Sequence, residues 1–184
     1  MAYQAKPEIK VNENITLKRL AHDADQAKYD AIVSNREHLL PWLPWAHFYH
    51  DFKEMPEYTE SQIKDFDAGV NFGYDIFYDD NFAGSIDLHN ISEANRSCEI
   101  GYWLSRNFTG KGIMTQAANA IIEYAFNELK MHRITILAAT ENKASCAVAE
   151  RLNFEQEGIL RDKQCLDDKY YDTAVYAKLN PNEQ

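Results

Sequence analysis

The sequence has few cysteines, no long apolar segment and no excess of basic residues, and each absence excludes a class of protein. Its three cysteines, Cys98, Cys146 and Cys165, are scattered and cannot all pair, so a disulfide framework is not expected. No apolar leader follows Met1, and no run comes near the roughly 18 apolar residues that a membrane helix needs. We therefore expect a cytoplasmic protein that does not enter a membrane.

Acidic residues outnumber basic ones by 29 to 19, for a net charge of −10. Nucleic acid is not an expected partner, because phosphate backbones bind to basic surfaces. The same charge would attract a cationic substrate such as an amine, or simply keep the protein in solution. With 184 residues, 45% of them apolar, the chain is expected to form one globular domain over residues 1–184, with residues 1–10 as a loosely held arm.

Two glycines one position apart precede a long helical pattern in the segment 103–129. Gly110 and Gly112 flank Lys111, so the main chain can approach a ligand closely there. Apolar side chains then recur at helical spacing from Ile113 to Leu129, which predicts a helix lying flat on a sheet. The N–H groups and the positive dipole end of that helix favour an anion, most naturally a phosphate. The alternative is a helix that simply begins after a glycine-rich loop.

The rest of the chain alternates strand and helix patterns. Runs rich in β-formers predict strands at Ile15–Leu20, Asn71–Tyr78, Phe82–Ile91, Ser97–Leu104, Arg133–Ala138, Glu155–Leu160, Lys163–Leu166 and Tyr170–Leu179. Helices are predicted at His22–Ser34, Pro56–Ala68 and Glu141–Leu152, the last with Asn142 as its N-cap. Turns of hairpins are predicted at Asp79-Asp80-Asn81 and at Asp167-Asp168. The sequence therefore predicts a fold of the α/β class.

The segment HLLPWLPW, residues 38–45, places two tryptophans and two prolines in one short apolar run. Prolines break a helix, so we expect a kinked turn that packs Trp42 and Trp45 against the core or against a ligand cleft. His47, His50 and Asp51 follow, but their spacing is not that of a metal site and no second cluster completes a shell. No metal is expected.

Two longer stretches resemble a known family. CEIGYWLSRNFTGKGIMTQAANAIIEYAF (98–126) and NKASCAVAERLNFEQEGILRD (142–162) resemble the GNAT superfamily of acetyl-CoA-dependent N-acetyltransferases. HLLPWLPW, GYWL and the closing ILRD and YYDTAVYAKL look like the RimJ/RimL branch, which acetylates N-terminal serine or alanine of ribosomal proteins. The resemblance runs from Ile15 to Leu179. It implies a mixed, mostly antiparallel sheet with helices on both faces, splayed at the cofactor cleft.

The resemblance also implies which residues hold acetyl-CoA, the cosubstrate. The gap between the strand ending at Leu104 and the strand 133–138 would take the pantetheine arm, main-chain amides of 109–115 would hold the pyrophosphate, and Asn142 to Ser145 would meet the sulfur end. The cofactor-binding residues implied are Ile100, Tyr102, Trp103, Leu104, Thr109, Gly110, Lys111, Gly112, Ile113, Met114, Thr115, Asn142 and Ser145.

Two positions depart from the family pattern. Asn107 stands where Gln or Arg usually opens the phosphate motif, a change that main-chain contacts should tolerate. Asn153 replaces the usual glycine of a Leu-Gly-Phe motif. Glycine there would follow a helix end in the left-handed conformation, and asparagine is the residue best able to replace it.

The implied reaction is direct attack of a neutral amine on the thioester. An α-amine, with a pKa near 7.7–8.0, needs less help from a base than a lysine near 10.4, which favours a protein N-terminus as acceptor. Glu99 is the candidate for the base or for binding the ammonium, unless it is only a solvated residue on a strand face. Ser145 is the candidate proton donor to the thiolate, unless it only assists the helix start. Substrate contacts are expected from Trp42, Trp45, Glu99 and Tyr171.

Other interpretations remain open. A polyamine or other small amine is the alternative acceptor, and a catalytically idle acetyl-CoA-binding module is the alternative from another class. The position where some relatives carry a tyrosine is Ala149, which closes that route to a proton donor. An acyl-enzyme on Cys146 is disfavoured because nothing beside it resembles a base. Exposed edge strands and an aromatic tail leave a homodimer as an alternative to a monomer.

Overall fold

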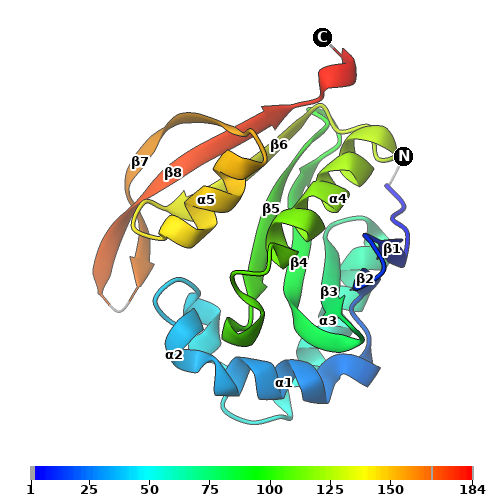
Figure 1. The fold of residues 1–184 in the computed structure, drawn as a ribbon, viewed down its shortest axis with the longest axis vertical. Coiled ribbons are helices and arrows are strands. Elements are labelled where there is room, and N and C mark those ends of the chain that lie inside the picture. Colours follow the sequence, from blue (N-terminus) through cyan, green and yellow to red (C-terminus); the bar gives the residue numbers. More distant parts are fainter. Residues whose placement is uncertain (1–2, 167, 184) are drawn as a thin grey trace.

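The computed structural model describes residues 3–166 and 168–183, and its strands form one sheet in the order β1-β2-β3-β4-β5-β6-β8-β7 (Figure 1). All neighbouring strands are antiparallel except β5 and β6, which are parallel. The strands are β1 Glu8–Lys10, β2 Ile15–Arg19, β3 Phe72–Tyr78, β4 Asn81–Ser92, β5 Ser97–Leu104, β6 Arg133–Ala139, β7 Glu155–Leu166 and β8 Lys169–Leu179.

Helices cover both faces of this sheet, as expected. The α-helices are α1 Asp25–Ser34, α2 Arg36–Leu39, α3 Glu54–Ala68, α4 Ile113–Asn127 and α5 Lys143–Arg151. Short 3-10 turns are η1 His22–Ala24, η2 Pro44–His47, η3 Arg106–Phe108 and η4 Pro181–Glu183. The break between α2 and η2 is the predicted proline kink.

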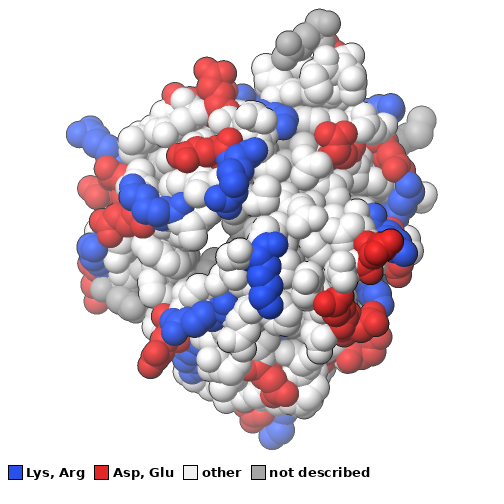
Figure 2. Space-filling view, in the orientation of Figure 1, with Lys and Arg blue, Asp and Glu red and all other residues white. Residues whose placement is uncertain are grey.

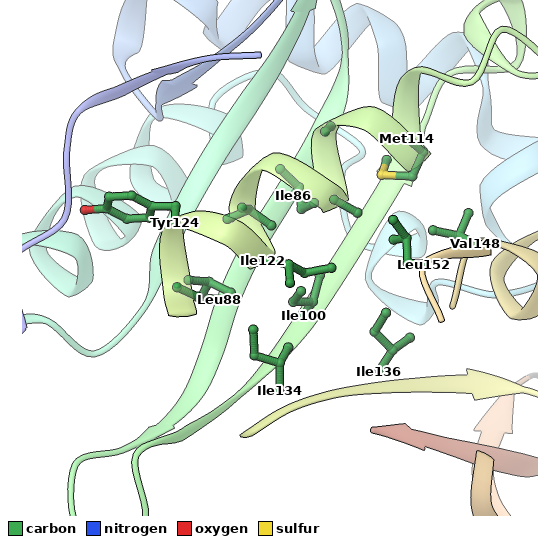
Figure 3. Close-up of a cluster of buried hydrophobic side chains, with 14 of the residues drawn as sticks. Ile86, Leu88, Ile100, Met114, Ile122, Tyr124, Ile134, Ile136, Val148 and Leu152 are labelled. Atoms are coloured by element: carbon green, nitrogen blue, oxygen red, sulfur yellow. The ribbon is translucent and has the colours of Figure 1, made fainter. Parts of the chain in front are cut away.

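The core lies between α4, α5 and one face of the sheet (Figure 3). The apolar stripe predicted for α4 is buried, with Ile121 and Ile122 fully covered, and Tyr124 is buried beside it. From the sheet, Ile86 and Leu88 of β4 and Ile100 of β5 face this helix. Residues that alternate with them on β4 and β5 therefore point to the opposite face, where α1 and α3 pack.

Two local predictions about turns and caps are confirmed. Asp79 and Asp80 have φ of 48° and 59°, the left-handed pair that a two-residue hairpin turn requires between β3 and β4. Asn153, just past α5, has φ of 58°, and Phe154 N donates to Ala149 O across the helix end. Asparagine thus takes the position at which glycine is usual.

The arm and the C-terminal strands differ from expectation. Residues 3–10 are held rather than loose: β1 pairs with β2, and Lys6 N donates to the Tyr124 hydroxyl at 2.8 Å. The predicted strands Glu155–Leu160 and Lys163–Leu166 are one strand, β7, interrupted by a bulge at which Asp162 has φ of 50°. A bulge inserts residues without ending the pairing, so the polar break in the sequence is not a turn. Of the predicted turn Asp167-Asp168, the first residue lies outside the described residues.

The sheet opens between its two parallel strands. β5 and β6 pair over three residues, from Ser97–Arg133 to Glu99–Thr135, and then diverge. β6 remains paired with β8 as far as Ala139, while β5 remains paired with β4 as far as Leu104. The predicted splay is therefore confirmed, and it exposes the main chain of Ile100 to Leu104 toward the gap.

A buried ion pair lies on the α1 side of the sheet. Lys28 Nζ of α1 is 3.1 Å from Asp75 Oδ2 of β3, with the side chains 2% and 1% exposed, although the two atoms are not aligned as a hydrogen bond. Ser85 Oγ donates to Asp75 Oδ1 at 3.1 Å. Burial raises the pKa of Asp75 to about 6, against the opposing effect of Lys28.

Replacing Lys28 with methionine is expected to destabilise the fold by about 3–5 kcal/mol, because it leaves a buried carboxylate without its cation. The folded pKa of Asp75 already lies above the ordinary value of an aspartate, so its contribution to stability is lost as pH rises through about 6, and the variant raises this pKa further. The loss in the free energy of unfolding should therefore be smaller at about pH 5 than at about pH 8.

Denaturant unfolding at both pH values measures this difference. The matched control is Lys64→Met on α3, since Lys64 pairs with Glu60 at the surface and should change stability by less than about 1 kcal/mol. Equal losses for the two variants would contradict the prediction.

Candidate active site

The turn before α4 has the geometry expected of an anion cradle. Gly110 and Gly112 have φ of +75° and +73°, the left-handed region that favours glycine. A Cβ added at Gly110 would meet nothing within 4 Å, so the turn opens outward. The first main-chain bond of the helix runs from Gln116 N to Gly112 O, 3.1 Å, which leaves the preceding amides of the first turn for a ligand. The site fits a diphosphate.

Positive charge gathers at the same place. Arg151, at the end of α5, donates from Nε to Thr115 Oγ1 at 3.2 Å and so reaches the first turn of α4. Figure 2 shows Lys and Arg side chains around the hollow on this face, despite the acidic balance of the whole chain. The ammonium of Lys111 instead stands over the rings of Tyr78 and Phe108, at 5.6 and 5.4 Å. The contribution of Lys111 to the turn is therefore its main chain.

A cleft of about 470 Å³ extends from this turn toward the splay. A second, about 180 Å³, lies between the diverging parts of β5 and β6. Tyr102, Asn142 and Ser145 line both clefts, as do Trp42 and Leu43. Most of the predicted cofactor-binding residues line one or both, namely Ile100, Tyr102, Trp103, Leu104, Thr109, Gly110, Gly112, Ile113, Met114, Thr115, Asn142 and Ser145.

A tyrosine and a serine meet where the two clefts join. The Tyr102 hydroxyl lies 3.0 Å from Ser145 Oγ and 3.1 Å from the Ser145 carbonyl. Asn142 caps α5 by accepting from Ser145 N at 3.1 Å, so the serine hydroxyl itself is not the cap. Burial raises the pKa of Tyr102 to about 12, which keeps this phenol protonated at neutral pH. The pair can therefore supply a proton within the cleft.

This phenol was not foreseen as a proton donor. The position on α5 where some relatives carry a tyrosine is Ala149, and Tyr102 was predicted only to contact the cofactor. Side chains alternate along β5, so Tyr102 lies on the same face as Ile100, under the helices. This alternation is the only signal in the sequence that indicated a contact between Tyr102 and α5.

The two predicted catalytic residues lie on opposite faces of β5. The side chain of Glu99 points away from α4 and α5 and is 28% exposed, with Oε2 3.5 Å from His89 Nε2. Ser145 approaches β5 from the α5 side. The structure thus places Glu99 and Ser145 on the two sides of the splayed strand rather than in one hydrogen-bonded cluster.

The predicted substrate residues form two aromatic contacts. Trp42 packs edge-on against Tyr171 of β8, with ring centroids 6.3 Å apart, and its carbonyl accepts from Gln164 Nε2 at 3.0 Å. This contact joins the 38–45 segment to the β7–β8 hairpin across the mouth of the cleft. Trp45 packs on Trp103 instead, at 5.9 Å, on the face that carries Glu99.

Other residues of the site were missed by the sequence. Four further residues line it: Arg151 at the phosphate turn, and His38, Leu39 and Val148 along the cleft. They lie in segments that carry the family resemblance, but no site role was predicted for them. Among the residues that the structure describes, no set of three or more His, Cys, Asp or Glu side chains is placed to hold a metal ion. Within the same residues, none of the helices has the length and apolar character needed to cross a membrane.

Comparison with known proteins agrees with this geometry. Residues 14–155 match the family model described as the acetyltransferase (GNAT) domain. The chain is 36% identical over 176 residues to the putative ribosomal N-acetyltransferase YdaF of Bacillus subtilis (strain 168), covering 92% of this chain and 93% of that protein. It is 30% identical over 171 residues to the ribosomal-protein-serine acetyltransferase of Escherichia coli (strain K12), covering 93% and 96%.

Solved structures match over the same extent. The microcin C7 self-immunity acetyltransferase MccE, in complex with acetyl-CoA and AMP, superposes with a TM-score of 0.90 at 31% identity, covering 95% of this chain and 97% of that one. RimL, the ribosomal L7/L12 α-N-protein acetyltransferase in complex with coenzyme A, gives a TM-score of 0.91 at 27% identity, covering 94% and 97%. With its glycine cradle and splayed sheet, the chain belongs to the GNAT acetyltransferase family and is an acetyl-CoA-dependent N-acetyltransferase.

Proposed function

We propose that this enzyme acetylates the N-terminal α-amino group of a protein, and that ribosomal proteins are the substrate class. The observation that carries the proposal is the match along nearly the whole chain to enzymes named for that reaction, at 30% identity to the ribosomal-protein-serine acetyltransferase.

The chemistry of the acceptor supports an α-amine. With a pKa near 7.7–8.0, a sizeable fraction of such an amine is already neutral near neutral pH. A lysine near 10.4 is neutral only about once in 1,000 at the same pH, a cost of roughly 4 kcal/mol. The carboxylates beside the splay and the net charge of −10 would attract the cationic form of either amine.

The roles of the chain's own residues follow from their positions. The main chain of Ile100 to Leu104 would hold the pantetheine arm and thioester oxygen, and the first-turn amides of α4 with Arg151 would hold the phosphates. Acetyl-CoA supplies the acyl group as a thioester. The Ser145 hydroxyl, backed by the Tyr102 phenol, would give a proton to the departing sulfur.

A thiol-release assay with several acceptors tests the proposal. Peptides that begin with serine or alanine should release coenzyme A thiol from acetyl-CoA faster than spermidine or free lysine does, at matched concentration. Mass spectrometry of the product peptide locates the acetyl group. The same peptides with a blocked N-terminus and an internal lysine are the control. Preference for spermidine would overturn the proposal in favour of a small-amine acetyltransferase.

The proposal places the enzyme in the cytoplasm, where ribosomal proteins are made, and treats residues 1–184 as one domain. The proposal also includes a homodimer. β7 is an edge strand, and its Ile159 and Leu160 are 52% and 42% exposed, which suits contact with a second copy. Light scattering that gives a monomer mass at working concentration would contradict the dimer.

A further inference from the structure

Three ionisable side chains form a chain of contacts on the face of the sheet away from α4. Asp87 and His89 are two residues apart on β4, and Glu99 on β5 is the register partner of His89. His89 Nδ1 is 2.5 Å from Asp87 Oδ1, and His89 Nε2 is 3.5 Å from Glu99 Oε2. The short contact with Asp87 holds the Nδ1 side of the imidazole ring. The distance from Nε2 to Glu99 is longer, so Nε2 makes no close contact there.

A glycine brings this cluster to the splay. Gly101 lies opposite Asp87, and a Cβ at that position would come within 3.0 Å of Asp87 Oδ1 and 3.2 Å of His89 Cε1. Both side chains therefore lean over the bare main chain of Gly101, which lines the cleft between β5 and β6. Pairing with β6 ends at Glu99, so the cluster begins where the strands part.

The same series of an aspartate, a histidine and a glutamate occurs elsewhere in the molecule. The two clusters therefore differ in location but not in arrangement. His22 lies between Asp25, 2.9 Å from Nδ1, and Glu60, 3.5 Å from Nε2. That cluster joins η1 and α1 to α3 and lies outside both clefts. An aspartate–histidine–glutamate series is therefore no sign of catalysis by itself, and it is the position of His89 at the splay that sets it apart.

An aromatic wall continues from the cluster along the same face. Trp103 contacts Trp45, Trp45 contacts Tyr49, and Tyr49 contacts Tyr58, each pair with ring centroids 5.9 Å apart. Burial raises the pKa of Tyr58, which stands at the end of the wall. Aromatic faces beside carboxylates suit a cationic amine on an extended peptide.

We propose that the acceptor binds as an ammonium ion between Glu99 and His89, and that His89, oriented by Asp87, removes the proton that frees the amine for attack. The inference rests on the proposed function and names the base of that site. His89 takes one proton from nitrogen and passes it to solvent. The nitrogen then forms the bond to the acyl carbon, and the carbon–sulfur bond breaks. Ser145 and Tyr102 give a proton to the sulfur, and the second proton that the nitrogen loses balances it.

The electrostatics agree with this role. The hydrogen bond to Asp87, opposed by desolvation and reinforced by Glu99, raises the pKa of His89. A higher pKa makes the imidazole a stronger base toward the ammonium. The charged groups in contact with His89 are Asp87, at Nδ1, and Glu99, at Nε2.

The test compares two acceptors in the full-length enzyme. One is the best N-terminal peptide for the wild type, and the other is the same peptide beginning with a fluorinated residue, whose α-amine has a lower pKa and arrives neutral. His89→Gln should lower kcat about 100-fold for the ordinary peptide near neutral pH and far less for the fluorinated one. Glu99→Gln should raise KM for the ordinary peptide more than it lowers kcat.

His22→Gln is the matched control, because it removes the equivalent imidazole outside the clefts and should leave both rates unchanged. Acetyl-CoA affinity by calorimetry reports whether each variant is folded. Equal loss of kcat with both acceptors in His89→Gln, or no loss, would overturn the role of His89, as would loss of acetyl-CoA binding in both cluster variants. Failure of the proposed function appears separately, as a wild type that acetylates another amine faster than these peptides.

Discussion

Replacing Gly112 with aspartate is expected to weaken acetyl-CoA binding about tenfold or more, a loss of at least about 1.4 kcal/mol. Gly112 has φ of +73°, so any side chain there is strained, and the residue is the N-cap of α4. A carboxylate at this point would face the diphosphate in the cradle and compete for the same helix amides. Titration calorimetry with acetyl-CoA measures the change.

Two further variants separate charge from strain. Gly112→Asn has nearly the shape of aspartate and tolerates the left-handed region, but it carries no charge, so it should lose less affinity. Gly158→Asp adds the same carboxylate on exposed β7, where a Cβ meets nothing within 4 Å, and should bind acetyl-CoA as the wild type does. Unchanged affinity in Gly112→Asp would remove the phosphate assignment of the turn.

Ser145→Ala and Tyr102→Phe are each expected to lower kcat about tenfold to 100-fold while changing acetyl-CoA affinity much less. The two hydroxyls are 3.0 Å apart, and burial raises the pKa of the phenol to about 12, so they hold a proton beside the cleft at neutral pH. Because the two groups would act as one donor, the double variant should be little slower than either single variant.

Kinetics of the two single variants and the double variant give this comparison directly. Tyr124→Phe is the matched control, since it removes another hydroxyl on a buried tyrosine, one that accepts from Lys6 N away from the cleft. Equal losses in kcat and in acetyl-CoA affinity would mean that the pair only shapes the site. Additive losses in the double variant would mean that the two hydroxyls act independently.

Much of the site followed from local sequence signals. The glycine turn before α4 and the N-cap at Asn142 were predicted from a few neighbouring residues, and the left-handed Asn153 from the family's Leu-Gly-Phe motif. The structure confirms the cap and the Asn153 conformation, and it gives both glycines of the turn a positive φ. The buried face of α4 was likewise predicted from the helical spacing of its apolar residues. The splay and the fold class came from the family resemblance rather than from any pattern of the residues themselves.

The partners of the side chains could not be predicted in this way. Lys28 and Asp75 are paired in the core although both residue types are usually exposed, because α1 docks with that face on β3. Residues 1–10 were expected to form a loosely held arm, yet β1 pairs with β2. Strand pairing is a long-range contact, and a three-residue strand leaves little trace in the sequence.

By itself, the sequence determined the backbone conformations that make an anion cradle, because the preference of glycine or asparagine for positive φ and the period of an apolar face act within a few residues. The tertiary structure alone decided which side chains meet: Tyr102 with Ser145, and Asp87 with His89 and Glu99. These meetings depend on the register between strands and on how α5 docks over β5, and no local preference of any one residue specifies either of them.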